Sequence, residues 1–214
     1  MQLMERQFAT YEMASLSSVA AYDLLASVVV PRPIAFVSTL SATGVANLAP
    51  FSFFMVGGSN PASLMYSPTL NSRAEEKDSL RNVRETGEFV VNLVHRPMAV
   101  GMNETSFSFG PDESEWDASG FTPIPSASVT PSRVGEALVQ FECKLFKVVE
   151  HGNGANAARY VIGEIVIAHL AEELVENPHE VRLISRMGGR NYLDMADGSI
   201  FELNRPKQPK PDGD

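Results

Sequence analysis

The sequence is poor in cysteine, in long apolar runs and in positive charge. One Cys in 214 residues leaves no intramolecular disulfide, so we expect a reducing, cytoplasmic setting. No stretch approaches the ~20 apolar residues of a membrane-spanning helix, and residues 1–20 lack the apolar core of a signal peptide. With 17 Lys and Arg against 26 Asp and Glu, the formal charge of −9 argues against nucleic-acid and anionic-membrane partners.

Charge is missing altogether from one long segment. Residues 33–72 contain no Asp, Glu, Lys, Arg or His, although 20% of the whole chain is charged. Ser, Thr, Asn, Gly and Pro interrupt the segment throughout, which indicates short strands and turns rather than a membrane helix. Neutral hydrogen-bonding groups beside apolar ones suit the wall of a cofactor site. A plain β core or a subunit interface explains the same composition equally well.

The periodicity of the sequence predicts a mainly β protein with a few helices. Short strands joined by hairpin turns favour an antiparallel barrel or sandwich. Strict alternation over 139–145 and a β-branched run over 159–170, with Gly163 as a bulge, predict two longer strands. The other expected elements are strands at 34–40, 45–49, 63–67 and 88–94, a turn at 41–44, and a helix at 78–85 that Gly87 ends.

We divide the chain into one domain with extensions. Residues 1–20 form an N-terminal extension, 21–204 the domain, and the proline-rich 205–214 a flexible C-terminal tail. Within the domain, 105–133 is rich in Ser, Pro and Gly and has no strong pattern. So long a connection is uncommon inside a compact domain, and we interpret it as a long loop, a lid or a dimer arm.

Familiar catalytic motifs are missing. There is no phosphate-binding GxxxxGK[ST] loop, no GxGxxG after a strand and no GxSxG. The four histidines are scattered, so we predict no metal site, and Cys143 falls among apolar positions of its strand. We therefore predict no catalytic side chain and expect any chemistry to come from a bound cofactor.

Two segments could hold such a cofactor. Residues 77–82 place Lys77 and Ser79 at a helix start, where free N–H groups attract a phosphate; an ordinary capped helix is the alternative. In residues 47–54, amide and hydroxyl groups alternate with aromatic ones. That composition suits a planar heteroaromatic ring, and equally an aromatic core cluster.

The chain also resembles a known family. Arg32–Thr39 (RPIAFVST), Asn47–Phe54 (NLAPFSFF), Lys77–Asn82 (KDSLRN) and the Arg186–Gly189 block (RMGG) occur in the order seen in the flavin reductase-like family. The weaker blocks at 85–92, 141–143 and 162–165 also fall in family order. The chain is most similar to the longer, flavoredoxin-like branch. Where shorter reductases carry Gly-Asp-His, it has His151-Gly152-Asn153-Gly154.

This resemblance implies an FMN-binding split β-barrel of the antiparallel, Greek-key type, usually a homodimer. It implies that the ribityl phosphate lies near Ser38, Thr39, Lys77 and Ser79. The isoalloxazine or ribityl chain would lie along Asn47, Leu48, Ala49, Ser52 and Phe53, with Ser67 and Pro68 beside them. Arg186 and Tyr192 would face the flavin or a second substrate.

The resemblance also implies an activity, an NAD(P)H:flavin oxidoreductase. Hydride would pass from NADH or NADPH to FMN, and electrons onward to an acceptor protein or an oxygenase. The alternative is a flavoredoxin-like electron carrier without direct nicotinamide use. The acidic stretch Asp112–Asp117 favours the carrier, because charged patches steer encounters between proteins. A third alternative is a barrel that has lost flavin and binds another ligand.

Overall fold

Antiparallel strands form most of the protein. The computed structural model describes residues 6–107, 109–110 and 113–206. A seven-stranded sheet has the order β2-β1-β5-β8-β9-β4-β3, and smaller sheets join β10-β11-β12 and β6-β7. The strands are β1 Ala35–Leu40, β2 Ala46–Phe51, β3 Phe54–Ser59, β4 Ala62–Tyr66, β5 Glu88–Leu93, β6 Pro123–Ile124, β7 Arg133–Val134, β8 Val139–His151, β9 Ala158–Leu170, β10 Ile184–Arg186, β11 Asn191–Asp194 and β12 Ile200–Glu202.

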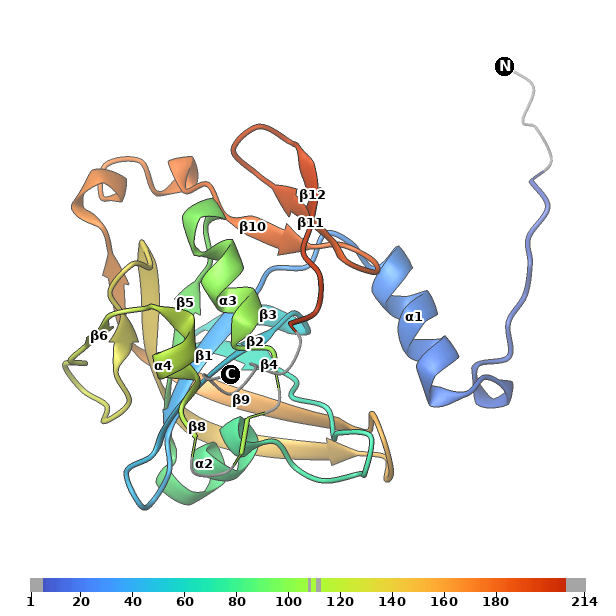
Figure 1. Ribbon diagram of the computed structural model, residues 1–214, viewed down its shortest axis with the longest axis horizontal. Helices are drawn as coiled ribbons and strands as arrows, with labels where there is room; N and C mark the ends of the chain where they lie inside the picture. The colour runs from blue at the N-terminus through green and yellow to red at the C-terminus, as the bar shows by residue number, and fades with distance from the viewer. Residues whose placement is uncertain (1–5, 108, 111–112, 207–214) are drawn as a thin grey trace, which may run out of the picture.

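Short helices lie around this sheet, except that α1 stands to one side of it (Figure 1). They are η1 Met13–Ser15, α1 Ser18–Val28, α2 Asp78–Thr86, η2 Arg96–Met98, α3 Ala99–Glu104, α4 Glu115–Ser119, η3 Glu172–Leu174 and η4 Pro178–Glu180. None of the helices in the described ranges is long and apolar enough to cross a membrane.

The sheet order confirms the expected antiparallel fold class. Hairpins join β1 to β2, β3 to β4 and β8 to β9, whereas β5 pairs with both β1 and β8. Two apolar clusters pack on the sheet. One gathers Phe36, Leu48 and Trp116, and the other gathers Tyr66, Leu80 and Phe89. The charge-free segment therefore contributes to both halves of the core.

Local turn chemistry explains two of the element boundaries. Gly44 closes the β1–β2 hairpin at a φ of 89°, with its N–H donating to Ser41 O at 3.0 Å. Gly87 ends α2 at a φ of 72° and donates to Val83 O. Both values lie in the left-handed region, which glycine enters without the steric cost of a Cβ.

The expected bulge at Gly163 is wrong, since the extra residue there lies on the opposite strand. Gly163 pairs with Leu145, and the next pair joins Ile162 to Lys147, so that β8 carries the extra residue. Glycine is needed at this position because a Cβ would approach the Phe89 ring within 2.4 Å. Close approach of a neighbouring side chain, not a bulge, requires the small residue.

The long connection over 105–133 contains more structure than expected. It includes α4 and β6, and it packs against β2 and the core. Ser114 Oγ donates to Ala46 O at 2.7 Å, and Trp116 packs into the core. Asp112 lies outside the described residues. These contacts bring α4 against β2 and complete one wall of the cleft described next.

Candidate functional site

A large cleft opens beside β2, with a cavity volume of about 810 Å³. Volumes of this size hold drug-sized ligands and cofactors. Segments far apart in sequence supply the walls: β2, the start of α2, the end of α3, α4, β10, β11 and the chain after β12. The tail expected to begin at residue 205 contributes here as well, since Arg205 and Pro206 line the cleft, whereas 207–214 lie outside the described residues.

One end of the cleft is built to receive an anion. Lys77 is the N-cap residue of α2, and within the described residues its side chain makes no capping hydrogen bond. The first N–H groups of a helix have no partner inside the helix, and the helix dipole favours negative charge there. Desolvation by the surrounding walls, then repulsion from Arg205, lowers the pKa of Lys77, although the side chain remains open to solvent. An anion bound here would relieve that repulsion.

Aromatic side chains form the wall next to this end. The Tyr22 and Phe53 rings lie 5.8 Å apart, and the Arg32 guanidinium stands 5.9 Å from the Phe53 ring centre. Lys77 Nζ is 5.4 Å from the centre of Phe51. A planar ring needs apolar faces and polar edges, and this wall offers both.

A buried hydroxyl in the cleft has no partner. Ser67 is 7% exposed and lines the cleft, and its Oγ makes no hydrogen bond within the described residues. Buried polar groups are hydrogen-bonded in the great majority of cases. An unpaired one in a cleft wall indicates a bound ligand or water as its partner.

Asn47, Ser79 and Glu115 form a polar cluster at the floor of the anion-binding end. Asn47 lies within hydrogen-bond distance of both Ser79 and Glu115, and Glu115 Oε2 accepts from Leu48 N–H at 3.0 Å. Burial raises the pKa of Glu115 to about 7, with a smaller contribution from Asp78. Glu115 is only 6% exposed. Within the acidic stretch that was expected to steer protein partners, Glu115 is therefore not part of the exposed surface.

The structure brings together nine of the thirteen side chains predicted to bind flavin. Those that line the cleft are Asn47, Ala49, Ser52, Phe53, Ser67, Lys77, Ser79, Arg186 and Tyr192. Arg186 stands 4.5 Å from the centre of the Tyr192 ring, and its Nη1 donates to Asn191 O.

The other four predicted residues lie behind the lining. Ser38 Oγ donates to Ser132 O, and Thr39 Oγ1 accepts from Asn82 Nδ2 at 3.1 Å. The Leu48 side chain is in the core and Pro68 is buried. Their side chains support the wall, and a flavin contact for them stays a prediction.

Sequence reasoning missed several charged residues of the cleft. Arg73, Arg190 and Arg205 line it, as does Glu115. The arginines come from loops and from the proline-rich tail, where no periodic pattern marks a position as facing a ligand. Near these arginines, only the blocks that resemble the family marked candidate site residues. Arg190 directly follows one such block, Arg186–Gly189.

Known proteins are similar to this chain in sequence. Residues 27–186 match the profile of the flavin reductase like domain. The chain belongs to the flavin reductase-like family. The Bacillus subtilis protein YwrF is 38% identical over 204 residues, which cover 92% of this chain and 98% of YwrF.

Solved structures of this family have the same fold. Component B of nitrilotriacetate monooxygenase from Bacillus cereus superposes with a TM-score of 0.84 at 33% identity, covering 93% of this chain and 100% of that one. A split barrel domain structure from Shewanella frigidimarina gives a TM-score of 0.74 at 20% identity, with 96% and 100% covered. This second likeness concerns the fold alone, and it identifies the sheet of this flavin reductase-like protein as a split barrel. The family supports a flavin-related oxidoreductase.

Proposed function

We propose that the protein binds FMN in this cleft and acts as an NAD(P)H:flavin oxidoreductase. Electrons would leave for an acceptor protein or an oxygenase. The observation that carries the proposal is the combination in one cleft of the Lys77 anion site, the aromatic wall and the unpartnered Ser67 hydroxyl. The likeness to a component of a monooxygenase supports an oxygenase as partner.

The residues of the cleft fit a flavin mononucleotide. Lys77 and the first N–H groups of α2 would hold the phosphate, as helix starts do elsewhere. Ser52 and Ser67 would hydrogen-bond to polar edges of the flavin ring, and Phe53 would pack against one of its faces. FMN, when bound, supplies the hydride and electron chemistry, and the protein supplies position and electrostatics. Arg186, beside Tyr192 in the lining of the cleft, would stabilise negative charge on the reduced flavin.

The visible absorption spectrum tests the proposal. We expect purified protein mixed with FMN and separated from free flavin to keep flavin bands. Addition of NADH or NADPH without oxygen should then bleach them. Protein that retains no flavin after titration would refute FMN binding, and bands that persist with both nicotinamides would refute the reductase activity.

A flavoredoxin-like electron carrier is the second candidate. His151, at the position of the Gly-Asp-His motif of shorter reductases, ends β8 and is not among the cleft-lining residues. The chain therefore lacks that histidine at the site. A flavin that is reduced by a reductase protein, yet inert to NADH and NADPH, would favour the carrier.

We further propose a homodimer in a reducing, cytoplasmic compartment. Figure 1 shows α1 standing to one side of the body, and residues 6–17 extend beyond it. Val19, Leu25 and Val28 are 61%, 47% and 63% exposed on this helix. Exposed large apolar side chains that gather on one element are typical of an interface. Cys143 is buried, which suits a protein without disulfides.

A further inference from the structure

Glu115 is a buried carboxyl group at the anion-binding end that the proposed chemistry does not use. It begins α4, and its two oxygens face β2. A carboxylate next to a phosphate site opposes the ligand when ionised. Its hydrogen-bond partners determine how a proton on Glu115 changes the hydrogen bonds at this end of the cleft.

The Asn47 amide connects Glu115 to Ser79, and it can do so in two orientations. In the first, Nδ2 donates to Ser79 Oγ at 3.0 Å, and Oδ1 faces Glu115 Oε1. In the second, Nδ2 donates to Glu115 Oε1 at 3.2 Å, and Oδ1 accepts from both Ser79 Oγ and Leu48 N–H at 3.0 Å. The partners of an amide decide which orientation it takes.

The proton on Glu115 selects between these orientations. An ionised Glu115 only accepts, so Asn47 must donate to it, and the Ser79 hydroxyl proton is then used on Asn47 Oδ1. A protonated Glu115 donates to Asn47 Oδ1 instead. Asn47 then donates to Ser79 Oγ, and the Ser79 hydroxyl proton becomes free to point into the cleft.

We propose that Glu115 is a proton-linked positioning residue that turns Ser79, through Asn47, into a donor toward a phosphate at the start of α2. The proposal rests on FMN binding as the proposed function. Binding of the phosphate and protonation of Glu115 therefore favour each other. Release of the ligand frees a proton, and a rise in pH promotes release.

The charged surroundings of Glu115 agree with this coupling. On α2, Asp78 disfavours a second negative charge, although its ion pair with Arg81 moderates it, and Lys77 provides the cation of the phosphate site. β2 presents only the Leu48 N–H and the Asn47 amide. The only ionisable residue of α3, Glu104, is exposed, as is Asp117 on α4 itself. The pKa of about 7 lies where small pH changes alter the charge.

The affinity for FMN as a function of pH tests the proposal. For the wild type we expect the Kd to rise by about tenfold between pH 6.5 and 8.5. If bound FMN raises the pKa of Glu115 by about one unit, the affinities of the two protonation states differ by a factor of about ten. A phosphate monoester changes charge near pH ~6, below this range. Glu115→Gln always donates to Asn47 and should bind at pH 8.5 as the wild type binds at pH 6.5. Asp117→Asn makes the same charge change at an exposed site and should behave as the wild type.

The pH profile of a Ser79 variant separates the hydrogen-bond route from simple charge repulsion. In Ser79→Ala we expect weaker FMN binding and a Kd that does not change with pH, because this variant lacks the hydroxyl that would donate to the phosphate. An unchanged pH profile in Ser79→Ala, or a wild-type profile in Glu115→Gln, would overturn the proposal.

NMR of the protein without flavin tests the route independently of FMN. The side-chain amide signals of Asn47 should titrate with a midpoint near pH 7 in the wild type and stay constant in Glu115→Gln. If they do not titrate in the wild type, the proposal is wrong even when FMN binds. If they titrate but FMN never binds, the proposed function fails and the proton link remains.

Discussion

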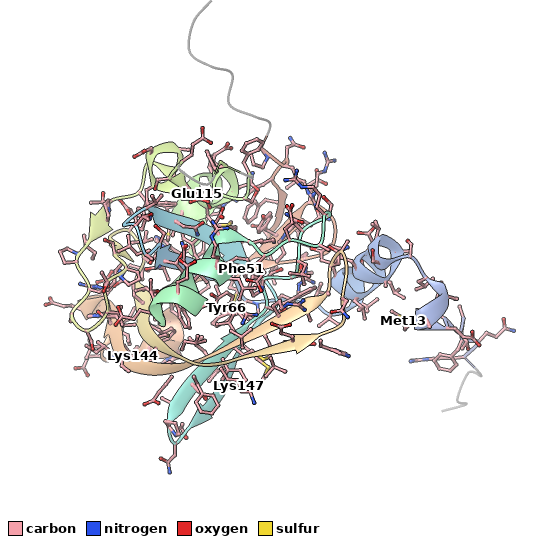
Figure 2. All side chains as sticks on the ribbon, turned by 90° about the horizontal axis from the view of Figure 1, so that it is seen from below. Met13, Phe51, Tyr66, Glu115, Lys144 and Lys147 are labelled. Carbon is pink, nitrogen blue, oxygen red and sulfur yellow. The ribbon has the colours of Figure 1, made fainter. Side chains whose placement is uncertain are left out.

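Among the described residues, Lys77 is the one lysine that lines the cleft, so its removal should weaken phosphate binding directly. We expect Lys77→Ala to reduce the binding free energy of FMN by ~1.5–3 kcal/mol, the scale of a hydrogen bond to a charged group. Fluorescence titration gives the Kd. Lys147→Ala is the control, because Lys147 is exposed on β8 outside the cleft lining, and Figure 2 shows it well away from Glu115. An unchanged Kd for Lys77→Ala would remove Lys77 from the site.

Glu115 also links pH to folding stability. Its pKa is raised from 4.5 to about 7 in the folded protein, so the folded state holds the proton more tightly than the unfolded chain. Below pH 4.5 both states are protonated, and the residue has no effect. Between pH 4.5 and 7 only the unfolded chain loses the proton, and stability falls as pH rises.

The Glu115→Gln substitution should remove this loss of folding stability at high pH. Above pH 7 we expect the variant to be more stable than the wild type by about 3 kcal/mol, at ~1.4 kcal/mol per pKa unit. Below pH 4.5 the two proteins should converge. Urea unfolding at pH 4 and pH 8 measures both. Equal stabilities at pH 8 would show that the folded protein tolerates the charge.

At the level of elements, the packing of the Phe89 side chain of β5 against β9 depends on Gly163. A Cβ at this position would lie 2.4 Å from Phe89 Cζ, in a core where Phe89 is fully buried. We expect Gly163→Ala to destabilise the fold by about 1–3 kcal/mol, the cost of overpacking. Thermal unfolding measures the loss. A second substitution, Phe89→Leu, should cost less in the Gly163→Ala background than alone, and strict additivity would contradict the contact.

The segment before β7 is held to the sheet by Glu142 of β8. This fully buried carboxylate accepts from Ala127 N–H at 2.7 Å and Ser128 N–H at 2.6 Å, and pairs with His169 at 2.7 Å. Desolvation alone would raise its pKa, but these hydrogen bonds lower it overall. Its stabilising effect is therefore present at neutral pH and lost as pH falls through the folded-state pKa.

Glu142→Gln should loosen that segment. The two N–H groups bind different carboxylate oxygens, and an amide has only one acceptor oxygen, so one of the two N–H donors loses its partner. We expect a loss of about 2–4 kcal/mol and faster proteolysis within residues 122–133. Glu164→Gln, at an exposed position of the neighbouring strand, is the control. Wild-type proteolysis of Glu142→Gln would show that the segment is held by other contacts.

The sequence predicted most of these elements because their cause is local. Alternation marked β8, and Gly87 marked the end of α2. β3 was missed, since Gly57 and Gly58 break its pattern and its residues are largely exposed. The burial of Glu115 could not be predicted, because its partner Leu48 is 67 residues away and α4 was expected to be loop. The cleft itself combines segments from both ends of the chain, which only the folded structure brings together.

For the molecule as a whole, the proposed dimer depends on the exposed apolar face of α1. A charge placed there should disrupt association. We expect Leu25→Glu to shift the molar mass from that of a dimer to 23.3 kDa in light scattering. Ser18→Glu adds the same charge at a polar, exposed position of α1 and should leave the dimer intact. A dimer that persists in Leu25→Glu would place the interface elsewhere.

The charge of the cleft lining differs in sign from that of the rest of the chain, and this difference should favour small anions over large ones. The cleft lining holds six Lys and Arg against four Asp and Glu, a net +2 within a chain of −9, so the remaining residues carry −11. Fields in salt solution fade over ~8 Å at physiological ionic strength. A nucleotide-sized anion that enters the cleft meets mainly the positive lining, whereas a polymer too large to enter meets the negative exterior. We therefore expect the cleft to favour small phosphate esters over large polyanions.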